Sequence, residues 1–119
     1  MPDVRHTIGY LAELNQGDDF TLAIPVLDEQ GEHTQLVEGE SLLVALYSAD
    51  GHRLCHATEE DMVYDTGDDC YLYEVTHQES IKMIGAVVVE ATLTDSDGVT
   101  HSPHKGKLYF EPRQNNDLL

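Results

Sequence analysis

One stretch of the sequence decides the fold: Gly85-Ala86-Val87-Val88-Val89-Glu90-Ala91-Thr92-Leu93-Thr94, followed by Asp95-Ser96-Asp97-Gly98. Every second residue from Val87 to Leu93 is apolar, while the intervening positions become polar toward the end of the stretch. Successive side chains of a strand point to opposite faces of a sheet, so this alternation predicts a half-buried β-strand. The Asp-Gly ending suits a tight hairpin turn, because both residue types tolerate positive φ. We therefore expect the other segments to be partners of this strand.

Other strand-like segments, separated by turns that contain Asp or Gly, fill most of the sequence before this stretch. They are residues 7–14, 20–27, 41–47, 52–57, 62–64 and 70–75. In 20–27 the alternation predicts one inward apolar face. Pro25 donates no ladder hydrogen bond, so this strand is expected to lie at a sheet edge or to change its partner strand there. The near-continuous apolar run 41–47 is typical of a strand near a sheet centre, covered on both faces.

A hairpin and a helical turn are predicted next in the chain. Segments 62–64 and 70–75 flank a five-residue loop rich in Asp and Gly, and the aromatic face of 70–75 is the expected core side. Thr76-His77-Gln78-Glu79 then matches the capping box S/T-x-x-E, which marks helix starts. We expect a short helical turn over about 76–84, with Gly85 as the residue that ends it.

The last strand of the predicted fold returns after the Asp-Gly turn. Residues 99–101 begin it, the segment 102–106 with its Pro and Gly interrupts it, and 107–111 complete it. Alternation places Leu108 and Phe110 inward. The return strand is therefore predicted in two pieces.

Seven to nine short strands with regularly spaced turns and one helical turn define the expected fold class. Such spacing is typical of an antiparallel β-sandwich of immunoglobulin-like type, an all-β fold. A chain of 119 residues fits one domain. We predict an N-terminal tail at 1–6, the sandwich domain at 7–112 and a C-terminal tail at 113–119.

Charge is the strongest feature of the composition. Six Lys and Arg residues stand against 23 Asp and Glu residues, which gives a formal net charge of −17. Nucleic-acid binding rests on basic side chains, so direct binding to DNA or RNA is not expected. Three interpretations of the acidity stay open: a solvated surface that resists aggregation, docking onto a basic partner, and mimicry of a nucleic acid.

The location expected from the sequence is a soluble one. No run of about 18 apolar residues is present, so no membrane span is predicted. The first six residues have no apolar core, so we expect no secretory signal and synthesis in the cytoplasm. Cys55 and Cys70 lie in strand-like segments and could be neighbours across a sheet, and we expect two reduced packing cysteines rather than a disulfide.

Seven histidines raise the question of a metal site. His52 and His56 are four residues apart on a predicted strand, which separates them by about 13 Å and is too far to share one ion. His101 and His104 flank a Ser-Pro turn and have a chelating spacing, but the sequence indicates no third ligand. Exposed loop histidines are therefore the expected outcome.

The acidic loops 65–69 and 95–98 carry the carboxylate oxygens that calcium prefers. Neither loop has the twelve-residue pattern of an EF-hand, and Asp and Gly suit such turns on backbone grounds alone. Adventitious calcium binding stays open, but we expect no required metal and no cofactor.

Catalytic constellations are missing from the sequence. No serine stands in a G-x-S-x-G elbow, and no phosphate-binding glycine loop is present. Cys55 and His56 would point to opposite faces of a strand, which is wrong for a thiolate–imidazole pair. We therefore expect a protein that is not an enzyme and has no catalytic, cofactor-binding or metal-binding residues.

The order of elements and turns resembles a known family. The shared features are Gly17-Asp18 after the first strand, Phe20-Thr21-Leu22-Ala23-Ile24 before Asp28-Glu29-Gln30-Gly31, Leu36 with Gly39 before Leu42-Leu43-Val44-Ala45-Leu46-Tyr47 and Asp50-Gly51, the capping box with Gly85 before Val87-Val88-Val89-Glu90, Asp95-Ser96-Asp97-Gly98, and Pro103 with Leu108-Tyr109-Phe110-Glu111. Over nearly the whole chain this resembles the immunoglobulin-like N-terminal domain of phage baseplate upper proteins and related tail-fibre attachment domains. In that family the domain is a structural module without catalytic residues.

The resemblance implies a structural protein of a phage virion, made in the host cytoplasm. Its partners would be other virion proteins, reached through protein–protein contacts in a tail or baseplate, with homo-oligomers within the assembly. Family members usually continue into a helical linker or receptor-binding region, whereas this chain stops at Leu119, a departure that counts against the expectation of a fibre-bearing role. A stand-alone adaptor and a small decoration protein on a capsid or tail stay open. We expect contacts at the exposed edge strands, with 20–27 and 107–111 as candidates.

Two rival functions stay open. An acidic inhibitor that mimics DNA would need its carboxylates in two rows, at the spacing of duplex phosphates. A calcium-dependent module of the carbohydrate-binding kind would use the acidic loops.

Overall fold

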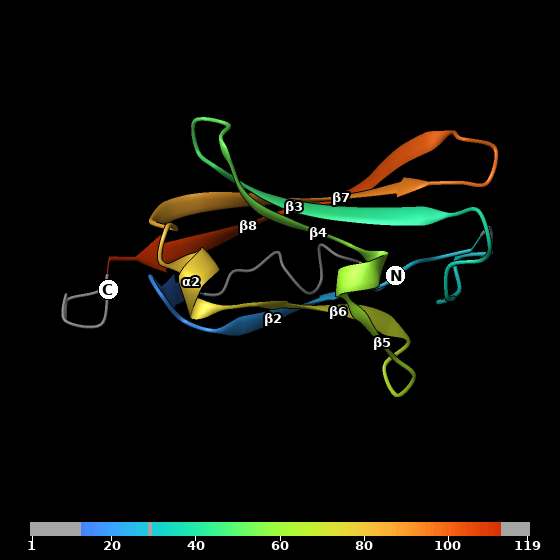
Figure 1. Cartoon of the computed structure of the whole chain (residues 1–119), viewed down its shortest axis with the longest axis horizontal. Helices are drawn as coiled ribbons and strands as arrows, with labels where there is room; N and C mark the ends of the chain where they lie inside the picture. The colour runs from blue at the N-terminus through green and yellow to red at the C-terminus, as the bar shows by residue number, and fades with distance from the viewer. Residues whose placement is uncertain (1–12, 29, 113–119) are drawn as a thin grey trace.

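The computed structural model describes residues 13–28 and 30–112, which form two packed β-sheets (Figure 1). In chain order the elements are β1 (Glu13–Asn15), β2 (Phe20–Ile24), β3 (Ser41–Ser48), β4 (Arg53–Thr58), the 3₁₀ turn η1 (Glu59–Asp61), β5 (Val63–Asp65), β6 (Cys70–Val75), α2 (His77–Ser80), β7 (Gly85–Thr94) and β8 (Thr100–Glu111). One sheet has the strand order β1-β8-β7-β3-β4 and the other β2-β6-β5. The predicted all-β, immunoglobulin-like sandwich is confirmed.

Strand β7 is the centre of the larger sheet, as its sequence predicts. It pairs antiparallel with β3 on one side and β8 on the other. Its inward residues Val87, Val89 and Ala91 are 0 % exposed, whereas the alternate residues are only half-buried. The turn that follows is closed by a hydrogen bond of 2.9 Å from Gly98 N–H to the Asp95 carbonyl. Local alternation and turn chemistry are thus sufficient to define this strand.

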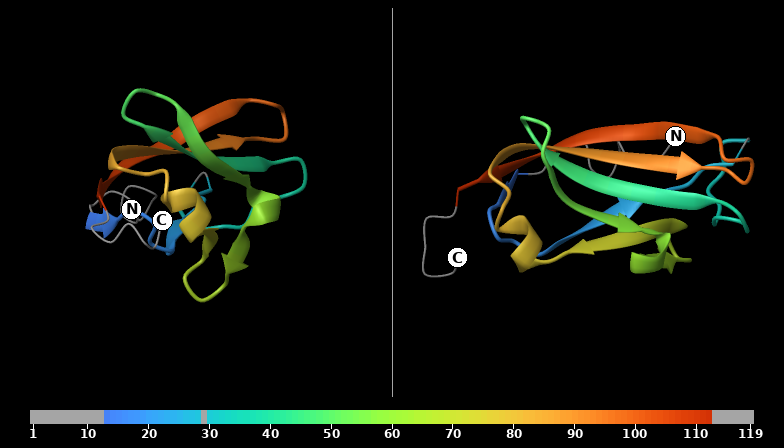
Figure 2. Two further views of the ribbon diagram at one scale, coloured as in Figure 1. Left: turned by 60° about the vertical axis from the view of Figure 1, so that its left-hand side comes forward. Right: turned by 45° about the horizontal axis from the view of Figure 1, so that its top comes forward.

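The core lies between the two sheets, where the inward faces of their strands meet (Figure 2). The larger sheet contributes Leu42, Val44, Leu46, Cys55, Ala57, Val87, Val89, Ala91, Leu108 and Phe110, and the smaller one Leu22, Ile24, Tyr71, Tyr73 and Val75. The predicted aromatic core side of β6 is confirmed, and so are the inward positions of Leu108 and Phe110. Burial of these alternating residues holds the sheets together.

Two short helical turns carry the chain from one sheet to the other. Residue Thr76 caps α2 with the predicted capping box, because the Glu79 carboxylate accepts the Thr76 N–H at 3.2 Å. The prediction for the end of the turn is wrong: α2 stops at Ser80, and Gly85 with φ +76° is the first residue of β7. The η1 turn, which joins β4 to β5, is a second helical turn in addition to the one that the sequence predicts.

The predicted interruption of the return strand is wrong. Strand β8 runs without a break from Thr100 to Glu111, through the Ser-Pro segment. On β7, Ala91 pairs with His104 and Leu93 with His101, so three steps on β8 face two steps on β7. Such a bulge leaves one residue out of the ladder, which lets a strand accommodate a proline without losing a hydrogen bond. The paired neighbour therefore overrides the local turn signal.

The edges of the sheets differ in part from expectation. Strand β2 lies at an edge of the smaller sheet as described, and it ends at Ile24, before Pro25. The expected edge at 107–111 is wrong in its last three residues, because β1 pairs with β8 in parallel at 109–111. Most of the predicted first strand, residues 7–12, and both predicted tails lie outside the described residues.

Candidate protein interface

The outer side of the five-stranded sheet carries two transverse rows of directly opposed residues, which we call the outer sheet face. The rows are Lys107–Val88–Tyr47–Arg53 and Lys105–Glu90–Ala45–His56, each taken in the order β8, β7, β3 and β4. Each row holds a cation on β8 and a basic residue type on β4. Residues with opposed Cα atoms share a face of the sheet, so these side chains form one surface.

Charge on the outer sheet face runs against that of the whole chain. Its single carboxylate, Glu90, is already neutralised by Lys105 at 3.6 Å. Lys107 and Arg53 are exposed, and among the described residues neither has an ion-pair partner. Strands are about 4.8 Å apart, which places the β8 and β4 positions of a row about 14 Å from each other. The result is an elongated patch, about 14 Å across the strands and about 7 Å along them, with cations at its β8 and β4 sides and the apolar groups of Val88 and Tyr47 between them.

The outer sheet face is bordered by an open strand edge. Among the strands that the structure describes, β4 is the last on its side of the sheet and pairs only with β3. It contains no proline, and in the described part of the chain the backbone hydrogen bond of β4 outside that ladder is at its last residue, where the Thr58 N–H donates to the Asp61 carboxylate at 3.1 Å. Every second residue of such a strand directs its N–H and C=O away from the sheet. A docking partner can therefore reach this face from the β4 side.

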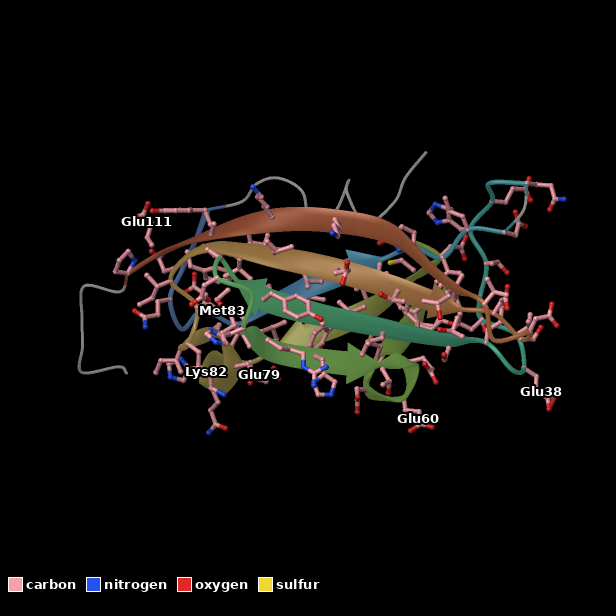
Figure 3. All side chains as sticks on the ribbon, turned by 90° about the horizontal axis from the view of Figure 1, so that it is seen from above. Glu38, Glu60, Glu79, Lys82, Met83 and Glu111 are labelled. Atoms are coloured by element: carbon pink, nitrogen blue, oxygen red, sulfur yellow. The ribbon has the colours of Figure 1, made fainter. Side chains whose placement is uncertain are left out.

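A second surface, which we call the acidic end, lies where four segments meet. They are the 28–40 connection, η1, the 65–69 segment and the 95–98 turn, and their twelve carboxylates with described positions are Asp28, Glu32, Glu38, Glu40, Glu59, Glu60, Asp61, Asp65, Asp68, Asp69, Asp95 and Asp97. No Lys or Arg occurs in these segments. Figure 3 shows Glu38 and Glu111 at opposite ends of the molecule.

Contacts among these segments hold the acidic end together. His33 Nδ1 lies 2.9 Å from the Asp69 carbonyl, which ties the 28–40 connection to the β5–β6 turn. A Cβ atom added to Gly39 would lie 3.0 Å from Ser96 Cβ, so the same connection passes directly over the β7–β8 turn. These contacts make one surface from segments far apart in the sequence.

Many carboxylates of the acidic end accept hydrogen bonds from the protein itself. Seven accept a hydrogen bond from a nearby N–H or hydroxyl group: Asp28, Glu40, Glu59, Asp61, Asp65, Asp69 and Asp95. Asp95, for example, accepts the N–H groups of Asp97 and Val99 at 3.0 and 2.9 Å. This accounts for Asp in the predicted acidic loops on backbone grounds. Among the described residues, no group of three or more His, Cys, Asp or Glu side chains has metal-binding geometry.

One buried cluster brings together residue types used in catalysis. The Tyr73 hydroxyl lies between the Cys55 thiol and the Glu79 carboxylate, 3.5 Å from Glu79 Oε2. Burial raises the pKa of the Cys55 thiol, which keeps it protonated at neutral pH. Burial also raises the pKa of the Tyr73 hydroxyl. A protonated buried thiol packs as a small apolar group and is a poor nucleophile.

The other residues considered from the sequence are dispersed. Cys55 points into the core and His56 is exposed, so the two diverge as predicted. Cys55 and Cys70 are both free and buried, but they lie in different sheets and are not neighbours across one sheet. His52 lies 3.2 Å from Asp50 in the exposed β3–β4 turn. The side chains of His101 and His104 lie outside the described residues.

Sequence reasoning did not find the outer sheet face. Its signal was Lys105-Gly106-Lys107, since two residues separated by one share a face of a strand. Because a break was predicted at 102–106, Lys105 and Lys107 were not expected to belong to one strand.

Comparisons with known proteins leave the chain without a family. No protein-family model matches it, and a search of curated proteins finds no match. Among solved structures, CopC from Methylosinus trichosporium OB3b is 14 % identical with a TM-score of 0.48, over 92 % of this chain and 88 % of that chain. A likeness at this level carries no argument about function. In the described part of the chain, no helix has the length and apolar character that a membrane span requires.

Proposed function

We propose that this chain is a non-enzymatic structural protein of a phage virion, a tail or baseplate adaptor that acts through protein–protein contacts. The phage setting rests on the sequence resemblance to baseplate upper protein domains. The adaptor role is supported by the surface of the sandwich. No cofactor is part of the proposal.

The observation that carries the adaptor role is the separation of charge. Twelve carboxylates gather at the acidic end, while three of the four described Lys and Arg residues lie on the outer sheet face. Surfaces of opposite sign on one small domain orient a partner and steer its approach. The open β4 edge adds a place where a partner strand or loop can align with the sheet.

Mass spectrometry of purified particles tests the virion assignment. We expect peptides of this chain in washed particles, at a copy number that matches the symmetry of a tail or baseplate ring. Immunogold labelling then separates a tail or baseplate adaptor from a capsid decoration protein, which would coat the head. Absence of the chain from washed particles would overturn the proposal.

The acidic end also supports a rival function, the mimicry of DNA. The carboxylates lie in four loop segments at one end, and seven of the twelve accept hydrogen bonds from those segments or from the strands beside them. A mimic works by competing with duplex DNA for a basic protein. If the purified chain displaces DNA from a DNA-binding protein of the host at micromolar concentration, the mimic is favoured over the adaptor.

A further inference from the structure

We propose that the outer sheet face of one copy of this chain binds the acidic end of a second copy. The inference deepens the adaptor role proposed above, since it names a partner and the two surfaces that meet. It is tested on the purified chain alone, so its failure leaves the virion assignment to be judged by the particle experiment.

Complementary charge is the first part of the argument. The outer sheet face presents Lys107 and Arg53 without described ion-pair partners, around a centre of Val88 and Tyr47. Its single carboxylate in the two rows is paired with Lys105. The net charge of the chain is −17, but the outer sheet face attracts a negatively charged surface.

The acidic end supplies the matching surface. Five of its carboxylates take part in no described hydrogen bond or ion pair, namely Glu32, Glu38, Glu60, Asp68 and Asp97, and all five belong to exposed residues. Their oxygens are therefore available to lysine and arginine side chains of another molecule.

The placement of the two surfaces makes the contact intermolecular. The Lys107–Arg53 row lies toward the end of the sheet at which β3 ends and β4 begins. The acidic end lies at the opposite end, where β3 begins and β7 ends, and Figure 3 labels its Glu38 there. The surfaces differ from each other, so the contact joins unlike patches of two identical chains. Such heterologous contacts produce a ring if the rotation closes and a filament if it does not. A closed ring fits the tail or baseplate role proposed above.

Ionic strength should affect this contact in two opposite ways. At about 10 mM salt the Debye length is about 30 Å, so the whole −17 charge of each copy repels the next. At about 1 M the Debye length falls to about 3 Å, and the contact pairs themselves are screened. We expect association to be strongest near 0.15 M and weaker at both extremes, a profile that purely apolar association does not give.

Sedimentation velocity of the full chain at these three ionic strengths, over a concentration series, measures the association. Lys107→Glu should weaken it by about tenfold or more, because it places like charges in contact. Lys82→Glu changes the net charge equally but lies away from the outer sheet face, beside Glu79 in Figure 3, and should have little effect. Lys105→Glu provides a second test of the face, and circular dichroism confirms that each variant is folded.

A charge swap completes the test. Glu38→Lys should weaken association of that variant alone, whereas Glu74→Lys, an equal change on the exposed side of β6, should not. A mixture of the Lys107→Glu and Glu38→Lys chains should associate more strongly than either variant alone, since their altered surfaces are complementary. Three results overturn the proposal. The first is a chain that stays monomeric under all conditions, and the second is an equal loss of association with Lys107→Glu and Lys82→Glu. The third is a mixture of the Lys107→Glu and Glu38→Lys chains that associates no more strongly than either variant alone.

Discussion

Replacing Phe110 with alanine tests how the core joins the two sheets. Phe110 lies on β8 and is 0 % exposed. Its ring centroid is 5.6 Å from that of Phe20, at an interplanar angle of 53°. Because Phe20 belongs to β2 of the other sheet, this aromatic pair connects the layers of the sandwich. The substitution therefore removes contacts that neither sheet can make alone.

The size of the effect follows from burial. Truncating a fully buried Phe to Ala costs about 3–5 kcal/mol, from lost transfer free energy and the cavity left behind. The aromatic pair accounts for about 0.5–1.5 kcal/mol of this. Domains of this size unfold with about 5–15 kcal/mol, so Phe110→Ala should remove about a fifth or more of the stability. A fall in the melting temperature of roughly 10–20 °C corresponds to that loss.

Urea unfolding followed by far-UV circular dichroism measures this cost, and Tyr109→Ala provides the matched control. Tyr109 is the adjacent residue of β8, points to the outer side and is 46 % exposed. Its truncation should cost about 1 kcal/mol or less. An equal loss of unfolding free energy in the two variants would show that the inward residues of β8 do not fill the core, and would refute the reasoning.

Three further predictions concern the α2 cap, a loop glycine and a buried thiol. Thr76→Ala removes the side-chain half of the α2 capping box, while the Thr76 N–H still donates to Glu79, and should lower the free energy of unfolding by about 1 kcal/mol in urea titration. Gly31 and Gly39 both have positive φ, but of these two only at Gly39 would an added Cβ atom contact another atom, Ser96 Cβ at 3.0 Å. Gly31→Ala should lower the free energy of unfolding by about 1 kcal/mol, and Gly39→Ala by distinctly more, as measured by thermal unfolding. Burial raises the pKa of Cys55, so above about pH 8.5 the unfolded chain loses the thiol proton first and binds fewer protons than the fold. The free energy of unfolding should therefore fall as pH rises from 8.5 to about 10, and Cys55→Ala should make that fall shallower.

Each of these predictions has a control within the chain. Gln78→Ala alters an exposed residue of α2 outside the capping box and should leave stability nearly unchanged. Ser96→Gly removes the atom that a Gly39→Ala side chain would meet, so the double variant should recover the extra loss. If Cys55→Ala shows the same decline above pH 8.5 as the native chain, the thiol is not the group responsible.

Several elements could be predicted from sequence because their causes are local. Alternation alone specifies the buried face of β7, and the Asp-Gly ending specifies the turn after it. The capping box locates α2, because its hydrogen bonds join residues three apart. The core side of β6 follows from the same period-2 argument.

Tertiary structure alone decided β8 and the candidate interface. Residues 102–106 read locally as a turn, but pairing with β7 makes them part of one strand, and a bulge absorbs the mismatch. The outer sheet face needs four strands in a fixed register to bring Lys107 and Arg53 into one row. The acidic end likewise joins segments separated by up to 70 residues. Local geometry determines which residues of a strand face inward, so alternation in the sequence is enough to predict them. The register between distant strands determines which outward residues lie together, and that register depends on the packing of the whole sandwich.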